Sequence, residues 1–237
     1  MKRYTSAAGL AVKLTWVPVT VYILALCVCQ WAAFLNVNNA ASHALEYRLD
    51  NWPMGCGRIG MPAMVLLLYS SLRGGKGSRI DYTLRRLSLS ERTVTAVWTL
   101  VFAGWFLLYW AAQLALMFAM YANYVSAYGG SENLLFVVAM RSKYFHYLLP
   151  LYEHWGFVRN VVLCVSCGYF SAQGARNARN GRWNPLCLFF LMAIPWGIMT
   201  PQSVANLWAD IAVTVCVIVC VIWDWIWTER WMRSEEA

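Results

Sequence analysis

Five apolar runs, each as long as a membrane-crossing helix, constrain this chain more than any other feature. A bilayer core about 30 Å thick is crossed by roughly 20 apolar residues in a helix. The runs of that length are 14–34, 52–72, 93–122, 156–175 and 207–227. A sixth run, 184–202, is shorter and is interrupted by prolines. The sequence therefore predicts an all-α polytopic membrane protein with six transmembrane helices in one transmembrane domain, residues 1–237.

Composition excludes a soluble globule. Hydrophobic residues make up 60% of the 237-residue chain and charged residues only 13%, which leaves too little polar side-chain area to cover a soluble protein of this size. The lipid bilayer is thus the first partner that the sequence predicts.

The positive charges predict the orientation, because cytoplasmic loops retain Lys and Arg during insertion. With the N-terminus inside, 14 of the 19 Lys and Arg residues fall on the cytoplasmic side. We therefore predict two cytoplasmic termini and a location in a cell membrane of bacterial type. The net charge of +8 is read as a topology signal, and no nucleic-acid partner is predicted.

Motifs for chemistry within this chain were not found. The three histidines do not form an H-E-x-x-H pattern, no G-x-S-x-G elbow is present, and Gly74 to Ser78 lacks the spacing of a phosphate-binding loop. The eight cysteines lie mostly in apolar runs, where a thiol usually packs as a small hydrophobe. We predict no enzyme activity, and no metal or cofactor bound by this chain.

Two polar residues within the runs are candidates for a translocation path. Gln113 lies well inside the third run and Asp210 lies early in the last one, and polar groups at membrane depth are costly unless they serve a function or find a partner. A hydrogen bond between helices explains either residue as well. Arg58 and Arg159 could extend to the membrane surface or pair with Asp210, and the expected role of both arginines is anchoring at the interface.

Small residues in the second run predict a helix-packing or dimer face. Gly57, Gly60 and Ala63 belong to this set, and small side chains let the backbones of membrane helices approach closely.

The loop 73–92 between the second and third runs carries the most specific local pattern. Ile80, Leu84 and Leu87 are spaced as one apolar stripe on a helix of about two turns. Ser88 and Glu91 have the spacing of a capping box before the third run. The pattern predicts a short helix, a break and a new helix.

The motif YTLRRLSLSER, residues 82–92, resembles the loop between the second and third spans of ABC-2 type transporter permeases, including the small permeases of bacterial peptide-antibiotic exporters. The resemblance implies a cytoplasmic coupling helix that docks on a separate ATP-binding subunit, which would hold the ATP and Mg²⁺. By position, the coupling residues would be Asp81, Tyr82, Leu84, Arg85, Arg86 and Leu87, with the two leucines in the cleft of the ATPase.

The resemblance also implies a second permease subunit, identical or related, and transport by ATP-driven rocking of the helices, most simply as an exporter. Two features depart from the family pattern. First, no room exists for a re-entrant insertion between the last two runs, and the longest segment outside the runs is instead 123–155. Second, few residues precede the first run, so the amphipathic N-terminal helix of the family would be short here. That segment fits either a helix in the outer membrane interface or an ordered lid over the helix ends. An ATPase-independent secondary carrier and a polytopic membrane sensor are the alternative functions.

Overall fold

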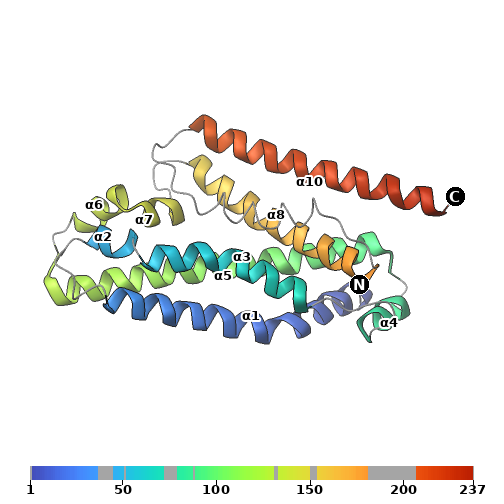
Figure 1. Cartoon of the computed structure of the whole chain (residues 1–237), viewed down its shortest axis with the longest axis horizontal. Helices are drawn as coiled ribbons and strands as arrows, with labels where there is room; N and C mark the ends of the chain where they lie inside the picture. The colour runs from blue at the N-terminus through green and yellow to red at the C-terminus, as the bar shows by residue number, and fades with distance from the viewer. Residues whose placement is uncertain are drawn as a thin grey trace.

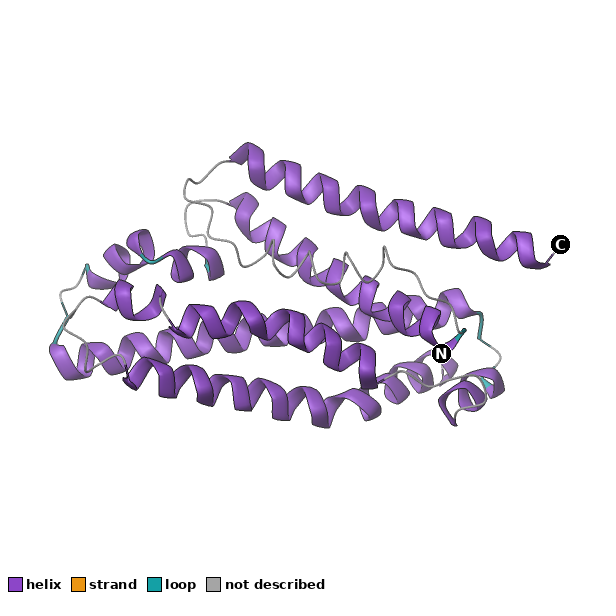
Figure 2. Ribbon diagram, in the orientation of Figure 1, coloured by secondary structure: helices purple, strands orange, loops and turns teal. Residues whose placement is uncertain are grey.

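The chain folds almost entirely into helices (Figure 2). The computed structural model describes residues 2–36, 45–50, 52–71, 79–87, 89–130, 133–149, 154–180 and 207–236. The long helices are α1 (Lys2–Asn36), α3 (Trp52–Ser71), α5 (Glu91–Tyr128), α8 (His154–Arg179) and α10 (Leu207–Glu236). The short helices are α2 (Leu45–Asp50), α4 (Arg79–Arg86), α6 (Leu134–Arg141) and α7 (Lys143–Leu148).

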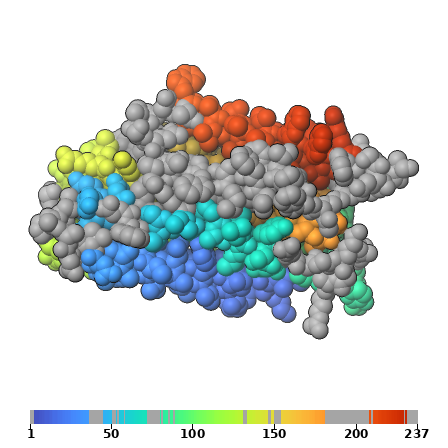
Figure 3. Space-filling view, viewed as in Figure 1, coloured from blue at the N-terminus to red at the C-terminus, as the bar shows by residue number. Residues whose placement is uncertain are grey.

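The long helices form a bundle with two different ends (Figure 1). The N-terminus, α4 and the C-terminal end of α10 lie at one end, which we call the α4 end. The short helices α2, α6 and α7 lie at the other, which we call the α7 end. Figure 3 shows α1, α3 and α10 following the long axis between these ends on one face of the molecule.

Side-chain hydrogen bonds fix the directions of the helices. Trp98 Nε1 of α5 donates to the carbonyl of Ala7 in α1, and Gln30 near the other end of α1 pairs with Gln113, so α1 and α5 run parallel. Contacts of Glu91 with Arg176 and Arg179 make α5 and α8 antiparallel.

Helices α8 and α10 run parallel, because Arg159 pairs with Asp210 near their starts and Gln173 with Thr228 near their ends. The predicted span 184–202 itself lies outside the described residues.

Helix α8 lies inside the bundle, and most of its residues are buried. Its approach to α5 is close at Gly168, where an added Cβ would lie 2.6 Å from the backbone nitrogen of Ala103 and 2.8 Å from the carbonyl oxygen of Thr99. Only glycine fits this crossing, because any side chain would push against the backbone of α5.

Three of the described helices are long and apolar enough to cross a membrane, which indicates a membrane protein. They comprise Arg3–Asn36, Glu91–Tyr128 and Asp210–Thr228. The predicted spans 52–72 and 156–175 form helices α3 and α8 but are not among the three, so the count of six spans stays a prediction. For α8 the physical reason is its polar composition, which a buried helix tolerates because its partners are other helices.

The helix boundaries differ from the apolar runs. The run 14–34 lies within a helix of 35 residues that begins at Lys2, and the run 93–122 lies within the 38 residues of α5. A helix of 38 residues is about 57 Å long, which is well beyond the thickness of the bilayer core. The hydropathy of the sequence marks only the apolar parts of these helices. The helical backbone hydrogen bonds continue beyond those parts.

Tryptophans on α10 mark two levels along the bundle. Trp208 is exposed at the start of the helix, and Trp223 and Trp227 are exposed in its second half, with stacked rings whose centroids are 6.5 Å apart. The levels are separated by about 25 Å of helix, and exposed Val215, Ile218 and Ile222 lie between them. This arrangement is typical of aromatic belts at the two surfaces of a bilayer.

Candidate functional site

The α4 end contains the segment that the sequence singled out. Residues Arg79–Arg86 form helix α4, and the backbone N–H of Leu87 donates to the carbonyls of Thr83 and Leu84, which closes its last turn. Helix α5 begins at Glu91. The predicted order of short helix, break and new helix is confirmed, while the coupling role of α4 is a separate question.

The apolar stripe of α4 faces the chain's own helices. Leu84 is only 4% exposed and belongs to the hydrophobic core, and Ile80 and Leu87 pack against that core. The expectation that Leu84 lies in the cleft of a partner is thus corrected, because the stripe attaches α4 to the bundle.

The outer side of α4 carries Tyr82 and Arg86. Tyr82 is 69% exposed, and Thr83 and Arg86 are exposed as well. The side chains of Asp81 and Arg85 lie outside the described part of the chain. A partner at this end would therefore meet an aromatic ring and a guanidinium group on a helix that is anchored from behind.

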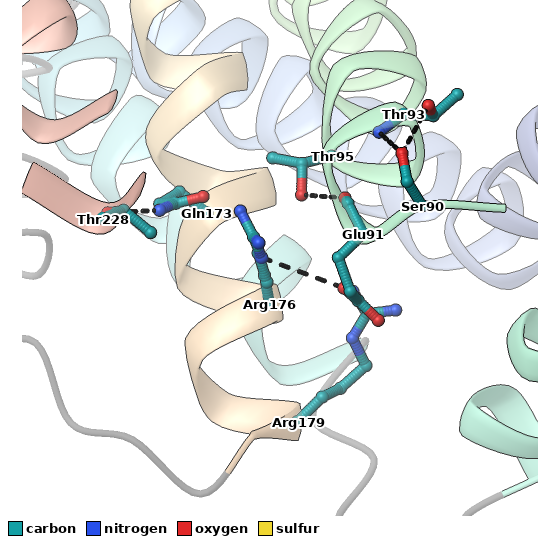
Figure 4. Close-up of polar contacts among 8 residues, drawn as sticks. All are labelled: Ser90, Glu91, Thr93, Thr95, Gln173, Arg176, Arg179 and Thr228. Carbon is teal, nitrogen blue, oxygen red and sulfur yellow. Dashed lines mark hydrogen bonds and ion pairs between the residues drawn. The ribbon is translucent and has the colours of Figure 1, made fainter. Parts of the chain in front are cut away.

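The start of α5 is capped by Ser90. Its Oγ accepts a hydrogen bond from the backbone N–H of Thr93 at 3.3 Å and lies 2.8 Å from the Thr93 hydroxyl (Figure 4). The predicted capping box from Ser88 to Glu91 is wrong, because α5 begins two residues later than that box requires. The Glu91 side chain turns to α8 instead.

Glu91 joins the start of α5 to the end of α8. Its Oε2 lies 3.3 Å from Nη2 of Arg179 and 3.9 Å from Nε of Arg176 (Figure 4). The Arg179 guanidinium also lies 4.5 Å from the ring centroid of Trp98, a cation–π contact. Because the helices are antiparallel, the carboxylate is at a positive helix N-terminus and the arginines are at a negative C-terminus, where each charge is favoured.

Helix α8 is in turn hydrogen-bonded to α10. Nε2 of Gln173 donates to the hydroxyl of Thr228 at 2.8 Å (Figure 4), and the hydroxyl of Tyr169 donates to Asp224 at 3.0 Å. The exposed helix α4 is therefore linked to α5 through the chain, to α8 through Glu91, and to α10 through two hydrogen bonds.

The two candidates for a translocation path are both engaged inside the chain. Gln113 is fully buried and exchanges two hydrogen bonds of 2.9 Å with Gln30. Asp210 forms a buried ion pair with Arg159, so the expectation that Arg159 anchors at the membrane interface is wrong and the alternative, a pair with Asp210, holds. Both residues join helices in this conformation, as the alternative in the sequence reading required.

The small residues of α3 face other helices of the same chain. A Cβ at Gly60 would lie 2.5 Å from Leu26 and from the Tyr109 hydroxyl, and one at Gly57 would lie 3.1 Å from Gln30. Ala63 is half-buried on the same helix. A second copy would have to displace α1 and α5 to reach the two glycines, so this face serves packing within the chain.

Sequence reasoning missed Glu91 and the two arginines as a cluster. The signal was the placement of an acidic residue in the first turn of one helix and basic residues in the last turn of another, but their pairing needs the antiparallel contact of α5 and α8. Among the described residues, no group of three His, Cys, Asp or Glu side chains could hold a metal ion.

Comparison with known proteins gives no relative. No family model, no curated protein and no solved structure matches the chain.

Proposed function

We propose that this chain is the membrane-spanning permease subunit of an ATP-driven ABC transporter, most simply an exporter in a cell membrane. A separate subunit would bind and hydrolyse ATP with Mg²⁺, and this chain would supply the helices that move. A second permease subunit, identical or related, would complete the membrane part.

The observation that carries the proposal is the construction of α4. This helix lies at one end of the bundle, beside the two ends of the chain, with Leu84 in the core and Tyr82 and Arg86 outside (Figure 1). One face of α4 is fixed to the bundle and the opposite face is exposed. Such a helix is suited to transmit force from a partner, because force on its exposed face reaches the bundle with little local rearrangement.

The ion pairs of Glu91 would determine which helices move when α4 is displaced. Closure of the partner subunit would shift α4, and the Ser90 cap would keep the start of α5 intact while it moves. Glu91 would then draw the end of α8 along through Arg176 and Arg179. This is a shift between two packings of the same helices.

Binding of an ATP-binding subunit tests the proposal. The native complex is extracted in mild detergent, and a co-purifying chain with a Walker motif is identified by mass spectrometry. In the double variant Tyr82→Asp/Arg86→Glu we expect at least a tenfold loss of that chain, about the effect of 1.4 kcal/mol or more of interface free energy.

The matched control is Tyr47→Asp/Arg141→Glu, which changes an exposed tyrosine and an exposed arginine at the α7 end. It should leave the complex intact. Unchanged association of the α4 variant, or a native preparation without any ATP-binding chain, would overturn the proposal and favour the secondary carrier or the sensor.

A further inference from the structure

Helix α7 is held at its start by a carboxylate from another part of the chain. Asp50, the last residue of α2, accepts hydrogen bonds from the Ser142 hydroxyl at 2.7 Å and from the backbone N–H groups of Lys143 and Tyr144 at 3.0 Å each. A negative charge at the positive end of a helix makes these hydrogen bonds strong. Asp50 therefore fixes α7 without any covalent connection nearby in sequence.

Helix α2, which carries this carboxylate, is itself fixed to α5. The Arg48 guanidinium lies against two neighbouring tyrosine rings, 5.4 Å from the centroid of Tyr124 and 4.9 Å from that of Tyr128. Its Nη2 also donates to the Tyr128 hydroxyl at 3.3 Å. Asp50 is thus a carboxylate on an anchored helix, and it holds a second helix of six residues.

The middle of α7 places a tyrosine inside the bundle. Tyr144 is 1% exposed, and its hydroxyl donates to Oε1 of Gln113. Burial raises the pKa of Tyr144, and the nearby thiols Cys27 and Cys56 raise it further, while a hydrogen bond with Gln30 lowers it. The hydroxyl therefore stays protonated and acts as a donor.

The glutamine pair behind Tyr144 is satisfied without it. Gln30 and Gln113 exchange two hydrogen bonds, and Nε2 of Gln30 also donates to the carbonyl of Pro53 at 2.9 Å. Departure of Tyr144 would free one acceptor position on Gln113 and end the contact of 3.4 Å between Gln30 Nε2 and the tyrosine hydroxyl, while Gln30 Nε2 keeps its hydrogen bonds to Gln113 and Pro53. The glutamine pair therefore adds little to the cost of moving the tyrosine, because its shorter hydrogen bonds remain.

The end of α7 is held by α5. Nε1 of Trp110 donates to the carbonyl of Leu148 at 3.1 Å, and Phe145 packs edge-on against Phe118 with ring centroids 5.9 Å apart. Phe145 and Leu148 are both buried. Helix α7 thus covers the α7 end of the bundle, in agreement with the lid alternative for segment 123–155.

We infer that α7 is a plug that closes the α7 end of the bundle and can be released, and that Asp50 is the latch that holds it closed. The α7 end opens when the hydrogen bonds from α7 to Asp50 break and the Tyr144 side chain moves away from the Gln30–Gln113 pair. As an exit gate for substrate, the plug rests on the proposed function. The contacts suit release, since Asp50 is half-buried and the Lys143 side chain is exposed, so water can replace the latch from outside. The six residues of α7 also form a small unit, of the kind that opens locally.

Thiol labelling tests the plug directly. Cys56 of α3 is half-buried and lies near Tyr144, so it reports on access to the space under α7. The purified chain in lipid nanodiscs, with both faces accessible, is treated with a membrane-impermeant maleimide, and the rate at Cys56 is followed by peptide mass spectrometry. Mapping by peptide separates this thiol from the exposed Cys29 and Cys216.

We expect Asp50→Ala to raise the Cys56 rate about tenfold, as local opening becomes easier. The near-isosteric variants Asp50→Asn and Tyr144→Phe keep the shape of the site and should each raise it several-fold. Glu46→Ala is the control, because Glu46 lies on α2 and pairs only at the surface with Arg141, 3.6 Å away, and it should label like the native chain.

Native-like rates at Cys56 in Asp50→Asn and Tyr144→Phe would overturn the inference, whether or not Asp50→Ala folds. The measurement needs neither a partner nor ATP, so it can fail while α4 still binds an ATPase. Conversely, the assay can show that the plug opens even if no ATP-binding chain is found. Failure of the plug inference and failure of the proposed permease function can therefore be distinguished.

Discussion

The main polar contacts at the two ends of the bundle differ in how deeply both partners are buried. At the α4 end, Tyr82 and Arg86 are exposed, and Glu91 is 44% exposed beside the arginines of α8. At the α7 end, the Arg159–Asp210 pair and the Gln30–Gln113 pair are buried. The carboxylate of the α4-end cluster is therefore partly in water although its two arginines are buried, whereas both members of each of these α7-end pairs are buried.

This difference assigns different tasks to the ends. Exposed groups lose little when they exchange water for a partner, so the α4 end is suited to binding. Buried pairs are costly to break singly, so the α7 end keeps one arrangement until a whole element moves. The predictions below test the contrast, beginning with the change of largest expected effect.

Removal of one charge from the buried pair at the α7 end should be the most damaging change. We expect Arg159→Leu to lower the free energy of unfolding by about 3 to 5 kcal/mol, because Asp210 would stay buried without its counter-charge. Unfolding in detergent by SDS titration measures it. The double variant Arg159→Leu/Asp210→Leu should recover most of the loss; a double variant as unstable as the single one would contradict this view.

The inner face of α4 should matter to folding and its outer face should not. We expect Leu84→Ala to cost about 2 kcal/mol or more, since it leaves a cavity in the core, whereas Tyr82→Ala should stay within about 0.5 kcal/mol. Thermal unfolding of the two variants measures the difference. Equal losses would mean that α4 is not anchored on one side only.

The tight crossing of α5 and α8 connects the two ends. We expect Gly168→Ala to cost about 1 to 3 kcal/mol, because its methyl group would press on the backbone of Thr99 and Ala103. The control is Gly104→Ala on α5, where an added Cβ meets nothing within 4 Å. That change should stabilise by up to about 1 kcal/mol. If both glycines tolerate alanine equally, the helices are not in contact at Gly168.

The ion pairs of Glu91 should give the smallest change. We expect Glu91→Gln to cost about 1 kcal/mol or less, since the carboxylate is partly exposed, and high salt should abolish the difference from the native chain. Unfolding at low and high salt measures this. The Arg159→Leu defect should persist in high salt, because burial excludes ions. Equal salt dependence at both sites would remove the contrast between the ends.

Local patterns predicted the elements well. The stripe of Ile80, Leu84 and Leu87 predicted the helix Arg79–Arg86, and the apolar runs lie within the long helices where these are described. The capping serine was misplaced by two residues because Ser88 and Ser90 both precede plausible helix starts, and only the backbone geometry selects between them. The sequence could not predict which surface the apolar stripe contacts, because the same spacing of apolar residues is expected whether the partner surface belongs to the same chain or to another.

The sequence by itself determined that this chain forms long apolar helices with a short amphipathic one between two of them, because helix formation and hydropathy depend on neighbours within a few turns. The tertiary structure alone decided that Glu91 meets Arg176 and Arg179 and that Asp50 holds α7. Those groups are about 90 residues apart in the chain, and only the directions and closeness of the packed helices bring them within the distance of an ion pair or a hydrogen bond.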